Sequence, residues 1–266
     1  PYEECKEFRP DGTKNPEGAK RRSSVKSIIL GIMYGRGAKA IAEQLNCSTK
    51  EAQKIVDTFY TEFPKVKKWM NDVLAHAREY GYVETAWGRK RRLPDVQLEP
   101  YEFELMAGGP STFDPLSWEE DQGEAEVDPA VKKKYIKQLE KTWSNKDRRD
   151  IIMRAREEGI KITDNGGKIA DAERQCVNSI IQGSSADMTK LAMIAINDNP
   201  RLKELDCHLL IQVHDEVICE CPEANAKECA ELLSSLMVGA AAEKIRVPMR
   251  CDAEVTRVWY GEPLEV

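Results

Sequence analysis

The sequence predicts an α+β protein that is mostly helical, with a partial antiparallel sheet and an inserted subdomain of helices and loop. Amphipathic segments with helix-capping residues fill the first third of the chain and return from about residue 172. Apolar strand-like runs are few and do not alternate regularly with helices, which favours antiparallel hairpins over a parallel sheet. Between these regions, residues 98–170 are polar and only thinly periodic.

The chain divides into four expected parts. Residues 1–19 contain Pro, Gly and Asp-Gly and predict an irregular lead-in. Residues 20–95 predict helices followed by a hairpin, and residues 96–171 an inserted subdomain with a partly mobile acidic loop. Residues 172–266 predict a long helix and then a hairpin centred on a His-Asp-Glu sequence.

Local signals define the elements of residues 20–95. Apolar spacing predicts helices over 20–33 and 37–45. Ser48 and Glu51 form a capping box that opens a third helix. Pro64 is placed to begin a fourth, and Gly81 to end it. The segment GYVETAWGRKRRLPD then predicts two short strands joined by a turn at Trp87-Gly88.

The remaining parts have different signals. From Glu99 to Ala130 the chain carries many acids and no Lys or Arg, and two polar helical segments follow. The pattern tightens in AERQCVNSIIQGSSADMTKLAMIAIND, which predicts a long helix. HLLIQVHDEVICECP predicts a hairpin, Pro222 begins another helix, and 247–259 predict a final strand.

Composition excludes several classes of protein. No apolar stretch of the 266 residues approaches the ~20 residues of a membrane span. Eight cysteines show neither a CxxC pair nor zinc-ligand spacing, so we expect reduced thiols and a cytoplasmic protein without membrane contact. GxxxxGK[ST], GxGxxG, HExxH and GxSxG are all absent. The net charge of −6 is unevenly spread, and residues 14–39 and 89–92 are locally basic.

One helical face changes its chemistry along its length. Arg22, Lys26, Leu30 and Tyr34 follow at steps of four, which aligns them on a single face of the helix. Cations in the first turns gain nothing from the helix dipole, which favours anions there. The face is either a charged start to an amphipathic helix or a surface that meets an anion.

A second face carries polar side chains at the same spacing. Arg174, Asn178 and Gln182 follow at steps of four in the long helix. Polar groups that share a buried face need partners. Nucleic acid offers phosphates for the cation and minor-groove acceptors for the amides. A polar network inside the protein is the alternative.

The hairpin IQVHDEV places two carboxylates, Asp215 and Glu216, between apolar runs. Charge in that position is costly unless a cation satisfies it. A divalent metal site is one interpretation, because Mg²⁺ takes carboxylate oxygens. An exposed turn at the hairpin tip is the other.

Taken together, these segments resemble the family A DNA polymerases, the group of bacterial DNA polymerase I and its phage relatives. RRSSVKSIILGIMYG resembles motif B of that family and IQVHDEV resembles motif C. ERQCVNSIIQGSSADMTKLAM is similar to the helix between these motifs, and GYVETAWGRKRRLPD matches a hairpin of the family. The resemblance covers most of 20–95 and 172–260 in the family's order. It implies helical fingers, part of the palm and a role in DNA replication.

The resemblance also implies roles for individual residues. Arg22 and Lys26 would hold the triphosphate of an incoming dNTP, and Leu30 stands where the family usually has Phe or Tyr beside the sugar. Tyr34 and Gly35 would lie near the template base. The implied DNA contacts are Arg174, Asn178, Gln182, Gln212 and His214. Asp215 would be a metal ligand with Glu216 beside it, and the implied catalytic set is Asp215, Glu216 and Lys26.

The implied reaction is template-directed nucleotidyl transfer at a primer 3′ end, with primer-template DNA and dNTP as partners and two Mg²⁺ ions. The family's motif A, an Asp in a DYSxxE-like context, is missing from the sequence. DPLSWEE at 114–120 imitates it only superficially. We therefore expect a C-terminal fragment that is inactive alone and whose metal site needs an N-terminal polymerase portion. The alternatives are a non-catalytic nucleic-acid-binding module and a structural subunit that pairs with a separate motif A chain.

Overall fold

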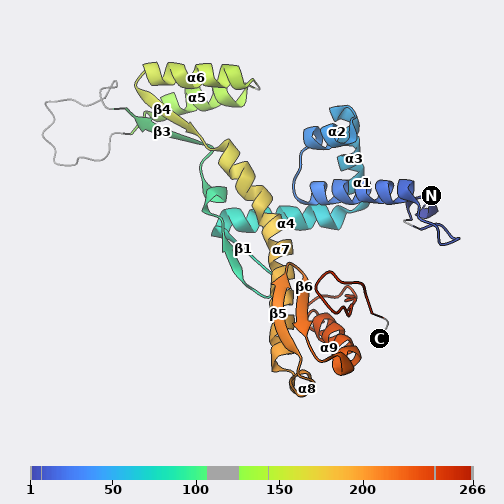
Figure 1. Ribbon diagram of the computed structural model, residues 1–266. Helices are drawn as coiled ribbons and strands as arrows, with labels where there is room; N and C mark the ends of the chain where they lie inside the picture. The colour runs from blue at the N-terminus through green and yellow to red at the C-terminus, as the bar shows by residue number, and fades with distance from the viewer. Residues whose placement is uncertain (1, 7, 107–125, 143, 243, 265–266) are drawn as a thin grey trace, which may run out of the picture. The chain divides into compact units, whose positions relative to one another are not determined.

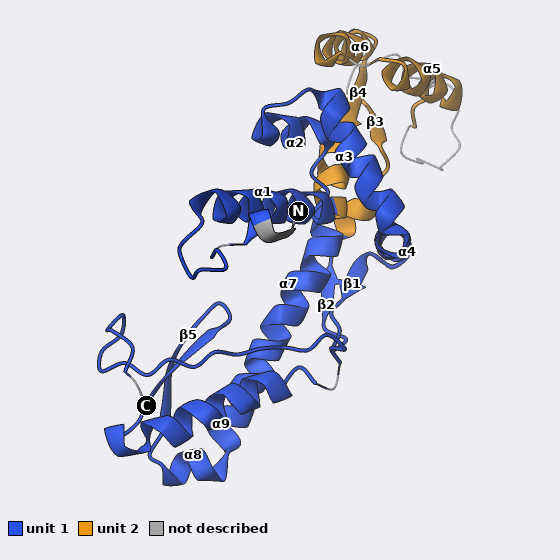
Figure 2. Ribbon diagram, turned by 90° about the vertical axis from the view of Figure 1, so that its right-hand side faces the viewer, with its two compact units in different colours: residues 1–93, 174–266 blue, residues 94–173 orange. Residues whose placement is uncertain are grey.

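The computed structural model describes residues 2–6, 8–106, 126–142, 144–242 and 244–264. The chain separates into two compact units (Figure 2). Unit 1 combines Pro1–Leu93 with Arg174–Val266, and unit 2 is Pro94–Glu173. The predicted α+β class is confirmed, because helices dominate and every named strand belongs to a two-stranded antiparallel sheet (Figure 1).

Unit 1 begins with a short 3-10 helix (Tyr2–Cys5), which is followed by the helices α1 to α4. Its helices are α1 (Pro16–Met33), α2 (Ala38–Leu45), α3 (Thr49–Glu62), α4 (Pro64–Tyr80), α8 (Pro200–Glu204) and α9 (Ala226–Gly239). Its strands are β1 (Tyr82–Glu84), β2 (Lys90–Arg92), β5 (His208–Val213) and β6 (Glu216–Glu220). The longest helix, α7 (Gly166–Asp198), begins in unit 2 and continues into unit 1.

The predicted end of α1 and the predicted signals of α3 and α4 are confirmed, but α1 begins at Pro16, four residues before the predicted start and inside the segment expected to be irregular. Asn15 caps α1, with its side chain accepting a hydrogen bond from the Gly18 N–H. At α3, the Ser48 and Glu51 capping box is complete in both directions. Gly81 ends α4 with a φ of 74°, a left-handed conformation that favours glycine.

Among the described residues, two apolar cores stabilise parts of unit 1. The first joins α1, α2 and α3 around the buried side chains of Ile32, Ile41 and Ala52. The second packs α8, α9 and the β5–β6 hairpin on the C-terminal part of α7, around Ile196, Leu202, Leu205 and Cys229. These cores fix the faces on which the candidate functional residues lie.

All eight cysteines are free thiols. Cys207, Cys219, Cys221 and Cys229 contribute to the second core of unit 1. Burial raises the pKa of the Cys207 thiol to about 11. These four side chains therefore behave as small apolar core residues at neutral pH.

Unit 2 has its own core. The strands β3 (Tyr101–Leu105) and β4 (Ile160–Asp164) form an antiparallel pair, and the helices α5 (Pro129–Glu140) and α6 (Asn145–Glu157) lie between them in sequence. Its buried side chains include Tyr135, Leu139, Ile151, Ala155 and Ile160. A 3-10 helix (Pro94–Gln97) precedes β3.

Two expectations need correction or restriction. The predicted strand over 247–259 is wrong, because the structure assigns no strand there. An extended apolar pattern becomes a strand only where a neighbouring strand pairs with it, and β5 and β6 pair with each other. The acidic stretch contains strand β3 rather than only loop, and residues 107–125, which include DPLSWEE, lie outside the described residues. No described helix has the length and apolar character needed to cross a bilayer.

The capping box of α3 yields a prediction about stability. Replacing Ser48 with Ala removes the side-chain acceptor for the Glu51 N–H and the donor to its carboxylate. We expect the free energy of unfolding, measured by urea denaturation, to fall by about 0.5–2 kcal/mol. Thr58→Ala, an exposed substitution inside the same helix, is the control and should change stability by less than about 0.5 kcal/mol. An equal effect of both variants would contradict the capping argument.

Candidate nucleic-acid interface

The cation-to-aromatic face predicted on the first helix lies on α1 and its C-cap. Arg22 and Lys26 are exposed, and neither forms an ion pair within the residues that the structure describes. Leu30 is 40% exposed, a high value for a leucine side chain. Tyr34 is the C-cap residue, whose N–H is bonded to the Leu30 carbonyl. The face therefore presents free cations, then an apolar side chain, then a phenol.

The end of α1 meets α7. The Gln182 Nε2 atom donates a hydrogen bond to the Tyr34 hydroxyl at 3.0 Å. Gly35 has a φ of 73°, and a Cβ atom added there would lie 3.1 Å from Cγ of Arg174. Glycine at this position therefore permits both the left-handed turn and the close approach to α7. Four of the predicted residues, Tyr34, Gly35, Arg174 and Gln182, are thereby brought together.

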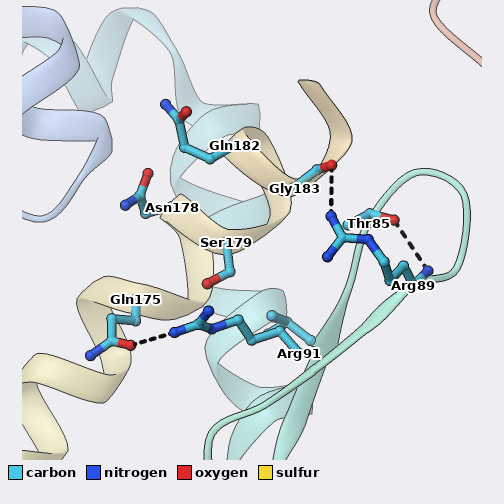
Figure 3. Close-up of a pocket in the computed structure, with 9 residues that line it drawn as sticks. Thr85, Arg89, Arg91, Gln175, Asn178, Ser179, Gln182 and Gly183 are labelled. Carbon is cyan, nitrogen blue, oxygen red and sulfur yellow. Dashed lines mark hydrogen bonds between the residues drawn. The ribbon is translucent and has the colours of Figure 1, made fainter. Parts of the chain in front are cut away.

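The polar face of α7 lines a pocket of about 410 Å³ with the β1–β2 hairpin (Figure 3). From α7 come Gln175, Asn178, Ser179, Gln182 and Gly183, and from the hairpin come Val83, Thr85, Arg89 and Arg91. The buried Oδ1 atom of Asn178 has no hydrogen-bond partner among the described residues. Because buried polar atoms are normally satisfied, the Asn178 side chain is suited to a ligand in this pocket.

Arg89 holds the hairpin against α7. Its Nε donates to Oδ1 of Asp187 at 2.7 Å, and its Nη2 donates to the Gly183 carbonyl at 3.0 Å. The Ala86 N–H donates to the Ser184 hydroxyl from the same turn. Burial opposes ionisation of Asp187, but hydrogen bonds from Thr85 and Arg89 outweigh it and leave the pKa of this carboxyl below its usual value.

Arg91 contributes a second cation to the pocket, and its Nη2 donates to Oε1 of Gln175 at 3.2 Å. Neither Arg89 nor Arg91 was assigned a role from the sequence. The only signal was the locally basic run at 89–92, which pointed to charge but not to α7. The pairing of Arg89 with Asp187 joins residues 98 positions apart, a separation that local patterns do not encode.

The predicted His-Asp-Glu hairpin is confirmed as β5 and β6 with His214 and Asp215 in the turn. His214 has a φ of 54°, in the left-handed region that glycine usually occupies. Its carbonyl accepts a hydrogen bond from Gln212 Nε2. Asp215 and Glu216 are exposed, and their carboxylates have no partner within the described ranges.

The donor chemistry of this turn suits a hard divalent cation, because such ions take carboxylate oxygens. Only two carboxylates are offered, however. In the part of the chain that the structure describes, no group of three or more His, Cys, Asp and Glu side chains is arranged to hold a metal. Asp215 and Glu216 therefore fit part of a metal site and do not complete one.

The α1–α7 contact, the pocket and the β5–β6 turn all belong to unit 1, but the described contacts join only the first two. Gln182 belongs to both the contact with Tyr34 and the pocket wall. Gln212, His214, Asp215 and Glu216 do not line the pocket.

Comparison with known proteins gives a consistent result. The family model described as DNA polymerase family A matches residues 12–106 and 128–261. The thermostable DNA polymerase I of Thermus filiformis is 28% identical over 240 residues, which is 90% of this chain and 20% of that protein. DNA polymerase I of Bacillus caldotenax is 28% identical over 239 residues, with the same coverage of both chains. This chain thus spans about a fifth of the length of these relatives.

A solved structure also resembles the chain. It is the POL domain of Pol1 from M. smegmatis in complex with DNA primer-template and dNTP. The TM-score is 0.53 at 25% sequence identity, and the match covers 83% of this chain and 28% of the other.

The close approach of the hairpin to α7 yields a second prediction. A Cβ atom at Gly183 would lie 2.7 Å from Cγ2 of Thr85 and 3.3 Å from Nη2 of Arg89. We expect Gly183→Ala to lower the free energy of unfolding by about 1–3 kcal/mol, because the hairpin must move away from the helix. Gly167 of the same helix is the control, because a Cβ atom added there would meet no other atom within 4 Å. Gly167→Ala should be neutral or stabilise by up to about 1 kcal/mol. A Gly183→Ala protein as stable as the wild type would contradict the contact.

Proposed function

The chain belongs to DNA polymerase family A, and we propose that it supplies the nucleotide-binding and template-facing part of template-directed DNA synthesis. The observation that carries the proposal is the contact between α1 and α7. At this contact Gln182, on the polar face of α7, donates a hydrogen bond to Tyr34. Tyr34 ends the α1 face that carries Arg22, Lys26 and Leu30. The M. smegmatis polymerase domain, which resembles the chain, was solved with DNA primer-template and dNTP.

In this proposal the α1 face binds the incoming dNTP. Arg22 and Lys26 are exposed cations without carboxylate partners in the described chain, so they are free to bind the triphosphate. Cation-to-phosphate hydrogen bonds are charge-assisted and roughly twice as strong as neutral ones. Leu30 would pack against the sugar, and the Tyr34 ring, held by Gln182, would lie beside the nascent base pair.

The α7 face and its pocket bind the primer-template. Gly35 leaves room for Arg174, whose guanidinium would reach a DNA phosphate. Asn178 Oδ1, which has no partner among the described residues, would accept a hydrogen bond from the 2-amino group of guanine, and the amide N–H groups of Asn178 and Gln182 would donate to base acceptors of the minor groove. Gln212 and His214 would approach the primer end from the β5–β6 turn. These contacts would hold the 3′ hydroxyl and the α-phosphate in line.

Asp215, with Glu216 beside it, would hold a divalent cation such as Mg²⁺. When bound, such a cation offsets the negative charge that develops during phosphoryl transfer. Asp215 and Glu216 provide two of the carboxylates that a two-metal site needs, and the described residues offer no third one beside them. We therefore propose that this chain alone does not extend a primer.

The role of Lys26 is tested by nucleotide affinity. In the presence of a primer-template, Lys26→Ala should weaken binding of a fluorescent dNTP analogue by about 10- to 150-fold, which corresponds to the loss of one charge-assisted hydrogen bond worth about 1.5–3 kcal/mol. DNA affinity should change by less than about threefold. Lys20→Ala, another exposed lysine of α1, is the control. If both variants bind the nucleotide as the wild type does, Lys26 is only a surface lysine and the proposed α1 role is wrong.

Activity of the chain alone is tested by primer extension. We expect no template-directed addition by the purified chain with Mg²⁺ and all four dNTPs, because Asp215 and Glu216 do not complete a two-metal site. A whole polymerase of the same family, assayed on the same labelled primer-template, is the positive control. Extension by the chain that is abolished by Asp215→Asn would contradict the expected inactivity while supporting the role of Asp215.

A further inference from the structure

Unit 2 contains a basic surface for which the family's motifs provide no role. Residues 129–157, which form α5, α6 and their connection, contain ten Lys and Arg against four Asp and Glu. The preceding stretch from Glu99 to Ala130 has no Lys or Arg. Positive charge is therefore concentrated on the helical pair rather than spread through the unit.

The cations near the sheet and the core of unit 2 are already paired. Arg148 donates to Asp164 at 2.6 Å, and Lys161 on β4 lies 2.8 Å from Glu104 on β3. Lys134 lies 3.6 Å from Glu158, and Lys132 lies 3.5 Å from Glu126. These ion pairs account for the cations that help to hold the unit together.

A second set of cations points away from the core. On α5, Lys133 and Lys137 are each two residues from buried Tyr135, which places them on the opposite side of the helix. On α6, Arg149 has the same relation to buried Ile151. The outward set, all exposed and without an ion-pair partner among the described residues, is Lys133, Lys137, Lys141, Lys146, Arg149 and Arg156.

The spacing of this outward set suits an extended polyanion. Lys133, Lys137 and Lys141 follow at steps of four, so they form one row about 12 Å long at 1.5 Å per residue. Duplex DNA presents one phosphate charge per about 1.7 Å of its axis, so a row of this length can face several phosphates. The six cations of the outward set outnumber the four acids of the same segment. At ordinary ionic strength, charges beyond about 10 Å are screened, so this local excess matters more than the net charge of the unit.

We propose that the outward face of α5 and α6 binds the backbone of duplex DNA, independently of base sequence. The inference rests on the proposed function, because a chain that acts on a primer-template has duplex DNA as its polyanionic partner. The face would add phosphate contacts to those of unit 1. It would contribute to affinity and to its salt dependence, not to nucleotide selection.

The test compares three double charge reversals in the full chain. Lys133→Glu with Lys137→Glu alters the α5 row, and Lys146→Glu with Arg149→Glu alters two outward cations of α6. Lys203→Glu with Lys227→Glu, exposed lysines of α8 and α9, is the control with the same change in total charge. Affinity for a labelled primer-template is measured by fluorescence anisotropy over a series of salt concentrations, with circular dichroism to verify folding.

We expect each unit 2 variant to weaken binding by about tenfold or more and to reduce the slope of log K against log salt by about 1.8, which is about 0.9 for each of two lost phosphate contacts. The control should change the slope by less than half as much. If the wild type binds DNA but both unit 2 variants match the control, this inference is overturned and the proposed function is unaffected. If the wild type binds no primer-template at all, both are overturned.

Discussion

The pocket between the β1–β2 hairpin and α7 depends on the hydrogen bonds that Arg89 of the hairpin donates to α7. One guanidinium bonds the Asp187 carboxylate and the Gly183 carbonyl, and so fixes both the position and the angle of the hairpin. Asp187 is buried, and its Oδ2 atom has no hydrogen-bond partner among the described residues, so its charge depends on the bond from Arg89 to Oδ1. The pocket exists because the two walls are held at this separation, and Gly183 allows the approach by having no side chain.

The elements that local chemistry determines could be predicted from the sequence. The capping box at Ser48, the start at Pro64 and the stop at Gly81 each depend on residues a few positions apart. Both hairpins of unit 1 were also predicted, because turn residues separate short strand-like segments. The strand expected at 247–259 was wrong because strand formation depends on a partner, and the apolar pattern of a segment says nothing about its neighbours.

The candidate site was predictable only in part. Spacing alone aligned the side chains of α1 and of α7 on two faces, and the structure shows that these faces meet where Gln182 donates to Tyr34. Nothing in either pattern required that contact, which joins residues 148 positions apart. Arg89 and Arg91 were missed for the same reason, because their place in the pocket depends on contacts with α7, which is distant in the sequence. The roles of these residues in nucleotide and DNA binding stay predictions.

The length of α7 restricts how this chain can vary. This helix has 33 residues, and the residues from Arg174 to Asp187 use two of its sides, one toward Tyr34 and one toward the hairpin. Each residue of a helix turns the next by about 100°, so adding or deleting a single residue within this stretch would rotate the later contacts away from the earlier ones. A substitution there alters one contact, whereas a change in length displaces all the later contacts together. Relatives that share the arrangement should therefore align through this stretch without gaps, and differ in length only in the connections on either side of it.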